Sequence, residues 1–206
     1  MNNTNDLRLR FECVHCGKCC TDLDTLVNTT YSDINRIKNG LNLNLDEIIE
    51  ILGFYIFDKK PTTKEISRMV VPPIETERGL AFVGLKKRLN YQCYFYDETK
   101  KRCSIYDFRP NFCRTFPFTF KLLIDKENPK KSEIEIFYTE KGLKYCQGIG
   151  ESAPFIDNDN WIQIGQEVIQ DLTKNNILIK EWNKGVKESK ISPSVRNFIL
   201  TIFNLE

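Results

Sequence analysis

The chain has 206 residues, of which 41% are hydrophobic and 28% are charged, and its formal net charge is +2. This composition is ordinary for one globular domain, and so small a net charge argues against the strongly basic class of nucleic-acid-binding proteins. No apolar run of about 18 residues is present to span a membrane, and residues 1–6 lack the apolar core of a signal peptide. We therefore expect a cytoplasmic protein without nucleic-acid or membrane partners.

The first feature along the chain is an eight-residue run, CVHCGKCC, which contains Cys13, Cys16, Cys19 and Cys20. In a reducing compartment, clustered cysteines are metal ligands or redox groups more often than structural disulfides. Thiolates three residues apart converge on one centre when the backbone turns between them, as in iron–sulfur and zinc sites. Gly17 lies where such a turn needs a positive φ. The run therefore predicts a metal site.

Two residues of this run need separate interpretation. Cys19 and Cys20 are adjacent, so their side chains point in different directions and do not easily bind one metal ion together. One of them belongs to a different centre or to none. We interpret His15 as an outward-facing turn residue, because the thiolates suffice as ligands; the alternative is a ligand or a proton carrier.

Two helices are predicted next. Ser32 is interpreted as the N-cap of a helix over residues 33–39 that stops at Gly40. Asn44, with Glu47 three residues later, is typical of a capping box that opens a helix over residues 45–56. The apolar positions of this second helix are spaced three and four apart, which places them on one face.

The middle of the chain changes to a pattern typical of strands. We predict strands over residues 66–71, 80–85 and 91–96, with a polar turn over residues 97–102. A hairpin is predicted from two further segments, 118–124 and 134–138.

The chain is predicted to be helical from Asp157 onward, with an interruption at Asn175-Asn176. Ser192 and Pro193 would then supply a cap and a first-turn proline for a last helix over residues 194–203. The fold class expected is α+β: a small antiparallel sheet with cysteine-bearing metal-binding loops, flanked by N- and C-terminal helices. We expect a metal-binding domain over residues 11–150 and a helical extension over residues 151–206 that packs on it.

The second half of the cysteine complement is widely spaced as C-x9-C-x9-C-x32-C, and its members are Cys93, Cys103, Cys113 and Cys146. Zinc ribbons normally use two tight CxxC pairs, so this spacing fits them poorly. The first run resembles the CxxCxxC of iron–sulfur ligation and differs from the CxxxCxxC typical of radical enzymes that cleave S-adenosylmethionine. Eight thiolates would suit two four-iron clusters, one four-cysteine site with spare thiols, or a polynuclear zinc site.

Arg109 and Arg114 flank Cys113. They could bind an anionic substrate or a partner carboxylate. We favour supporting roles, in which they balance the negative charge of a thiolate cluster and hold the loop in place, because uncompensated buried charge is costly. Aromatic residues crowd the same region and are interpreted as an apolar shell around a cluster, with a substrate pocket as the alternative; they are Tyr91, Tyr94, Tyr96, Tyr106, Phe108, Phe112, Phe116 and Phe118.

Several motifs in order resemble a known family. These are FxCxxCxxCC from Phe11, the segment CSIYDFRPNFCRTFPF over residues 103–118, and Cys146-x-Gly148. Together they are similar to the YkgJ-like cysteine-cluster family, a zinc- or iron-chelating CxxCxxCC domain. Tyr96 stands where the family commonly has Leu, and Asn90 or its neighbours replace a usual Gly. The resemblance covers residues 11–150 and all eight cysteines.

The resemblance implies metal or iron–sulfur binding. One branch, the flagellin lysine N-methylases, implies an enzyme that modifies protein lysines, but this chain has no glycine-rich turn to bind S-adenosylmethionine. Our leading hypothesis is a cytoplasmic iron–sulfur protein with one or two [4Fe–4S] clusters held by the eight cysteines. It would act in electron transfer or in an unassigned redox or transfer reaction, with a redox or protein partner. The alternatives are a zinc-stabilised binding module and a lysine-methylase-like enzyme.

Overall fold

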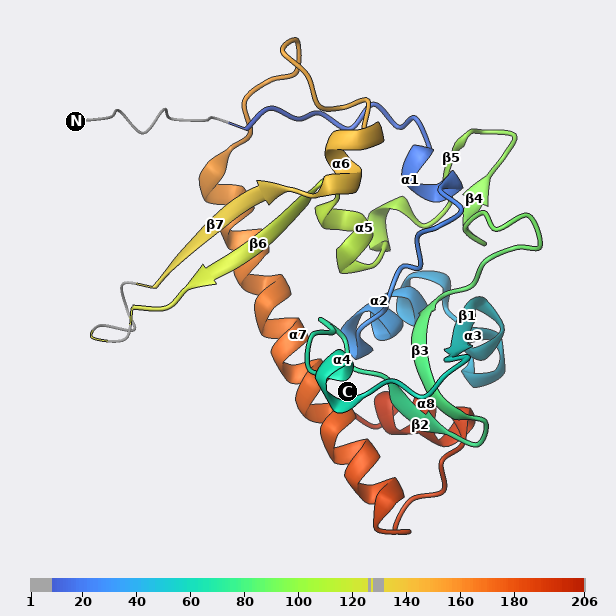
Figure 1. Cartoon of the computed structure of the whole chain (residues 1–206). Coiled ribbons are helices and arrows are strands. Elements are labelled where there is room, and N and C mark those ends of the chain that lie inside the picture. The colour runs from blue at the N-terminus through green and yellow to red at the C-terminus, as the bar shows by residue number, and fades with distance from the viewer. Residues whose placement is uncertain (1–8, 126, 128–131, 206) are drawn as a thin grey trace.

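A computed structural model describes residues 9–125, 127 and 132–205, which form helices and small antiparallel sheets, as expected for the α+β class (Figure 1). The helices are α1 (Lys18–Thr21), α2 (Tyr31–Leu41), α3 (Leu45–Ile51), α4 (Thr63–Ile66), η1 (Tyr106–Phe108, a 3₁₀ helix), α5 (Asn111–Thr115), α6 (Glu140–Tyr145), α7 (Asn158–Lys187) and α8 (Val195–Phe203). The strands are β1 (Leu52–Ile56), β2 (Ile74–Thr76), β3 (Gly79–Leu85), β4 (Tyr96–Asp97), β5 (Arg102–Cys103), β6 (Phe118–Leu123) and β7 (Glu133–Tyr138).

The strands form three antiparallel units. A three-stranded sheet has the order β1-β3-β2, with Leu52 opposite Leu85 and Ile74 opposite Ala81. The short pair β4–β5 places Tyr96 opposite Cys103. The hairpin β6–β7 stands apart from the other two units (Figure 1).

Helix α7 joins the parts of the molecule. It contacts the hairpin β6–β7 along its N-terminal half and strand β2 and helix α2 further along (Figure 1). Its core-facing side includes Val168, Ile179 and Trp182, all buried. Trp182 packs edge-on against Phe198 of α8 and donates a hydrogen bond from Nε1 to the carbonyl oxygen of Glu75. In the described part of the chain, no helix combines the length and apolar character needed to cross a membrane.

Several sequence predictions are confirmed. Asn44 and Glu47 form the expected capping box at the start of α3. Strand β3 and hairpin β6–β7 occupy the predicted segments, and a turn separates β4 from β5 as predicted. Helix α7 begins directly after Asp157, whose side chain accepts a hydrogen bond from the backbone of Asn160.

Three predicted elements have the wrong type or length. The helix predicted over residues 45–56 ends at Ile51, and Leu52–Ile56 becomes strand β1 because each of its residues pairs with β3. No strand covers residues 66–71, since a capping box at Thr62 opens α4 just before that segment. In the segment 91–96, Cys93 donates its N–H to the carbonyl oxygen of Cys20, and regular strand pairing begins only at Tyr96.

Helix ends and continuity also differ from prediction. The cap of α2 is Thr30, which forms a capping box with Asp33, and Gly40 lies inside the helix. The cap of α8 is Ser194, two residues after the one predicted. Asn175 does not interrupt α7, because its buried side chain accepts a hydrogen bond of 2.9 Å from the backbone N–H of Tyr31.

Candidate metal centre

All eight cysteines line one cavity of about 80 Å³. They arrive from five segments: the N-terminal run, the loop before β4, strand β5, helix α5 and the end of α6. None forms a disulfide. The structure therefore brings together every cysteine that the sequence analysis proposed as a ligand, including pairs more than one hundred residues apart.

A backbone ladder holds the N-terminal run against the segment after α6. The N–H of Phe11 donates to the carbonyl oxygen of Pro154 at 3.0 Å, and the N–H of Glu12 donates to that of Gly148 at 3.1 Å. A side chain at Gly148 would overlap the carbonyl oxygen of Glu12, so this close approach requires glycine. These hydrogen bonds hold the segment before Cys13 against the segment after Cys146.

Gly17 turns the chain into helix α1. Its φ is +70°, as the sequence analysis expected, and a Cβ there would lie 2.6 Å from the ring of Tyr96. His15 is exposed but also lines the cavity, and its ring centroid lies 4.6 Å from that of Tyr106. The turn thus places Cys19 and Cys20 on α1, where both line the cavity.

Helix α1 is joined to the second cysteine group by backbone hydrogen bonds. The carbonyl oxygen of Cys20 accepts the N–H of Cys93 at 2.9 Å, and that of Cys93 accepts the N–H of Tyr96 at 3.0 Å. Since Tyr96 pairs with Cys103, these bonds place three cysteines from distant segments side by side.

The thiols influence one another. Hydrogen bonding with the Cys20 thiol lowers the pKa of Cys19 to about 7 and that of Cys103 to about 7. The same interactions, with Cys103 and to a smaller extent with Cys19, raise the pKa of Cys20. Removal from water raises the pKa of Cys93 to about 11 and that of Cys113 well above its usual value. Cys19 and Cys103 therefore ionise more readily than an ordinary thiol.

The two flanking arginines have separate roles. Arg109 lines the cavity, and its guanidinium lies 3.7 Å over the ring of Tyr106. Its positive charge contributes to the lowered pKa values of Cys19 and Cys103. Arg114 instead donates to a carboxylate oxygen of Glu167 on α7 at 2.7 Å. Arg109 therefore places its positive charge at the cavity, whereas Arg114 ties helix α5 to α7.

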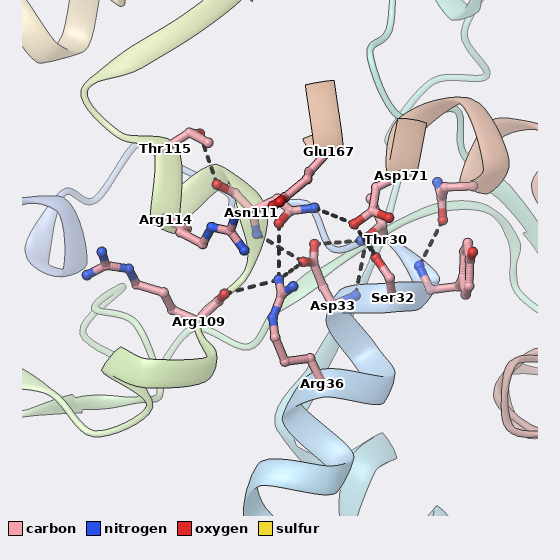
Figure 2. A network of polar contacts seen from close by, with 12 residues as sticks. Thr30, Ser32, Asp33, Arg36, Arg109, Asn111, Arg114, Thr115, Glu167 and Asp171 are labelled. Atoms are coloured by element: carbon pink, nitrogen blue, oxygen red, sulfur yellow. Dashed lines mark hydrogen bonds and ion pairs between the residues drawn. The ribbon is translucent and has the colours of Figure 1, made fainter. Parts of the chain in front are cut away.

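A buried polar network positions helix α5, which carries Cys113 (Figure 2). The Asp33 carboxylate is fully buried and accepts the N–H of Asn111 at 2.9 Å and that of Thr30 at 3.0 Å. Arg36 pairs with Asp33 and also donates to the carbonyl oxygen of Arg109 at 3.2 Å. Burial raises the pKa of Asp33, and the partners named here oppose that shift. The network fixes the backbone on both sides of Pro110.

Sequence reasoning did not find this network, although a Thr-x-x-Asp capping pattern at Thr30 marks its starting point. It also missed Lys87, whose charge favours the thiolate of Cys93. Its aromatic shell is only partly present at the cavity: Tyr106 and Phe116 line it, whereas Tyr91 is 64% exposed.

A wider cleft of about 720 Å³ adjoins the cavity and shares Cys19 and Cys113 with it. Phe112, Phe116 and Phe118 line this cleft. Some of the aromatic residues predicted to form a shell around the metal therefore line this cleft beside Cys19 and Cys113.

The donor set fits a thiophilic metal or an iron–sulfur cluster, because the thiolates are soft ligands surrounded by a largely apolar wall and Arg109. Among the described residues, no three Cys, His, Asp or Glu side chains converge closely enough to hold a single metal ion. The thiols share the cavity without meeting at one point.

Comparison with known proteins shows similarity to a protein family and to distant relatives. Residues 12–146, which include all eight cysteines, match the CxxCxxCC family, described as a "putative zinc- or iron-chelating domain". An uncharacterized protein of Methanocaldococcus jannaschii is 22% identical over 189 residues, covering 91% of this chain and 84% of that protein. No solved structure matches the chain.

Proposed function

Because this chain belongs to the CxxCxxCC family of zinc- or iron-chelating domains, we propose that its eight cysteines hold iron as one or two [4Fe–4S] clusters. The observation that carries the proposal is the single cavity that all eight thiols line. Free cysteines used only as small hydrophobic residues would have no reason to gather from five segments. The run CxxCxxC, the absence of tight CxxC pairs elsewhere in the sequence and the number of thiols favour iron–sulfur clusters over one zinc ion.

The surrounding residues suit a charged cluster. A [4Fe–4S] cluster with four thiolate ligands carries net negative charge, and when bound it supplies one-electron redox chemistry. Arg109 offsets part of that charge from the cavity wall. The apolar side chains Ile105 and Phe116 line the same wall and limit contact with water, which influences the reduction potential.

The position of the centre suits electron exchange with a partner. Cys13 and Cys19 are exposed, and Val14 between them in sequence is 55% exposed. A redox partner protein could therefore approach the thiols directly. We propose electron transfer, or a redox or transfer reaction at the cluster, as the role of this centre and the cytoplasm as its location.

Metal analysis tests the proposal. The protein is purified without oxygen, and iron, zinc and acid-labile sulfide are measured per chain together with a visible spectrum. Iron with matching sulfide and a brown colour that bleaches in air would support it. Zinc without sulfide would overturn the iron–sulfur assignment and leave a zinc-stabilised binding module.

A further inference from the structure

We propose that the eight thiols form two separate metal centres of four cysteines each, with the boundary between Cys19 and Cys20. The inner set is Cys20, Cys93, Cys103 and Cys113. The outer set is Cys13, Cys16, Cys19 and Cys146. The division rests on the proposed metal binding by these thiols, and four thiolates are the ligand set of one [4Fe–4S] cluster.

Packing separates the two sets. The main hydrophobic core contains Cys93, and Cys20, Cys103 and Cys113 pack against it. No outer-set cysteine takes part in that core. The inner set therefore lies against the folded interior, whereas the outer set lies between α1 and the segment after α6.

The backbone separates the sets in the same way. Hydrogen bonds link Cys20 to Cys93 and, through Tyr96, to Cys103. A different ladder, from Glu12 to Gly148, brings the start of the run to the segment that follows Cys146. Cys13 and Cys146 are thus held by backbone hydrogen bonds in which the inner cysteines take no part.

Helix α1 explains how the boundary falls between neighbours. Consecutive residues of a helix point about 100° apart. In agreement, Cys19 is exposed whereas Cys20 is half-buried against the core. The exposure of Cys19 assigns it to the outer set, although its thiol shares a hydrogen bond with the Cys20 thiol across the boundary.

Single and double substitutions test the division by metal content. Cys146→Ser represents the outer set and Cys103→Ser the inner set, and each is purified without oxygen and analysed for iron, zinc and sulfide. Each should keep about half of the wild-type metal, which for iron means a fall from about eight to about four per chain. Cys13→Ser combined with Cys146→Ser should lose no more than Cys146→Ser alone, whereas Cys103→Ser combined with Cys146→Ser should lose all metal.

Controls separate this proposal from the proposed function and from misfolding. Ser104→Ala, next to Cys103, should retain full metal, and circular dichroism should show that Cys146→Ser, which lies outside the core, remains folded. A wild-type protein with a single centre, or a folded Cys146→Ser that loses all metal or none, would overturn the division while leaving metal binding intact. A wild-type protein without metal would overturn the proposed function itself.

Discussion

The inner and outer cysteine sets are held by different means. The inner set is fixed by the hydrophobic core and by the Asp33 network, which holds helix α5 with its Cys113. The outer set depends on a ladder of backbone hydrogen bonds and on one close approach at Gly148. Identical ligands can therefore be held by different parts of a structure. The inner scaffold belongs to the core and contributes to the stability of the whole protein, whereas the outer scaffold is a local structure.

The largest effect should follow from removing Asp33. Asp33→Ala leaves the Arg36 guanidinium and the N–H of Asn111 without their buried partner, so the free energy of unfolding should fall by about 3–5 kcal/mol. Urea denaturation measures this change. Asp46→Ala, which removes only an exposed ion pair with Arg196, should cost less than about 1 kcal/mol. Equal losses of unfolding free energy in the two variants would show that the buried network contributes no more to stability than an exposed ion pair.

Gly148→Ala should act on the outer scaffold alone. The new methyl group would displace the carbonyl oxygen of Glu12, and overpacking of this kind costs about 1–3 kcal/mol. Metal of the outer set should be lost while that of the inner set remains. The matched control is Gly150→Ala, because nothing lies within 4 Å of a Cβ at Gly150. Retention of full metal by Gly148→Ala would contradict the role given to the ladder.

A smaller effect should distinguish the two arginines. Arg109→Gln removes a positive charge from the cavity wall, which disfavours the reduced and more negative cluster. The reduction potential should fall by tens of millivolts, where about 59 mV corresponds to a tenfold change for one electron. Arg114→Gln breaks only a surface pair with Glu167 and should leave the potential unchanged. Electrochemical titration of both variants measures the difference, and equal shifts would remove the special role of Arg109.

The smallest effect concerns pH and the junction between the two scaffolds. Asp22 follows α1 and pairs with Lys141 of α6. Although burial opposes the shift, hydrogen bonds from Lys141 and Thr25 lower the pKa of Asp22 to about 2, below the value of about 3.9 in an unfolded chain. Its contribution to stability is therefore complete above pH ~4 and is lost as the pH falls toward ~2.

Acid unfolding of Asp22→Asn tests this assignment. The variant should be less stable than the wild type near neutral pH, and the difference should shrink between pH ~4 and ~2. Lys141→Gln should reduce the same difference, because it removes the partner. A constant difference across this range would mean that Asp22 does not titrate with a lowered pKa.

Local signals in the sequence predicted local structure well. The capping box at Asn44, the hairpin β6–β7 and the start of α7 all depend on residues close together in the chain. The switch from helix to strand at Leu52 was missed because it depends on pairing with Leu85, a partner that the periodicity of the first segment does not reveal. Long-range pairing overrode a favourable helical pattern.

The candidate site shows the same limit. Sequence spacing identified the cysteines, and the structure places them in one cavity. The network around Asp33 was not predictable, because the carboxylate and its partner Asn111 are 78 residues apart and neither is unusual by itself. The helix interruption predicted at Asn175 was wrong for a similar reason. Asparagine lowers the local helix propensity, but here its side chain accepts a hydrogen bond from the backbone N–H of Tyr31.

The ladder around Gly148 also bears on where the domain can be divided. The family match stops at residue 146, so it contains every thiol. The carbonyl oxygens that receive Phe11 and Glu12 belong to Pro154 and Gly148, beyond that limit. A fragment of residues 12–146 would keep all eight cysteines but lose the backbone hydrogen bonds to Gly148 and Pro154 that hold Cys13 near Cys146. The unit recognised by sequence similarity is therefore shorter than the unit that must fold.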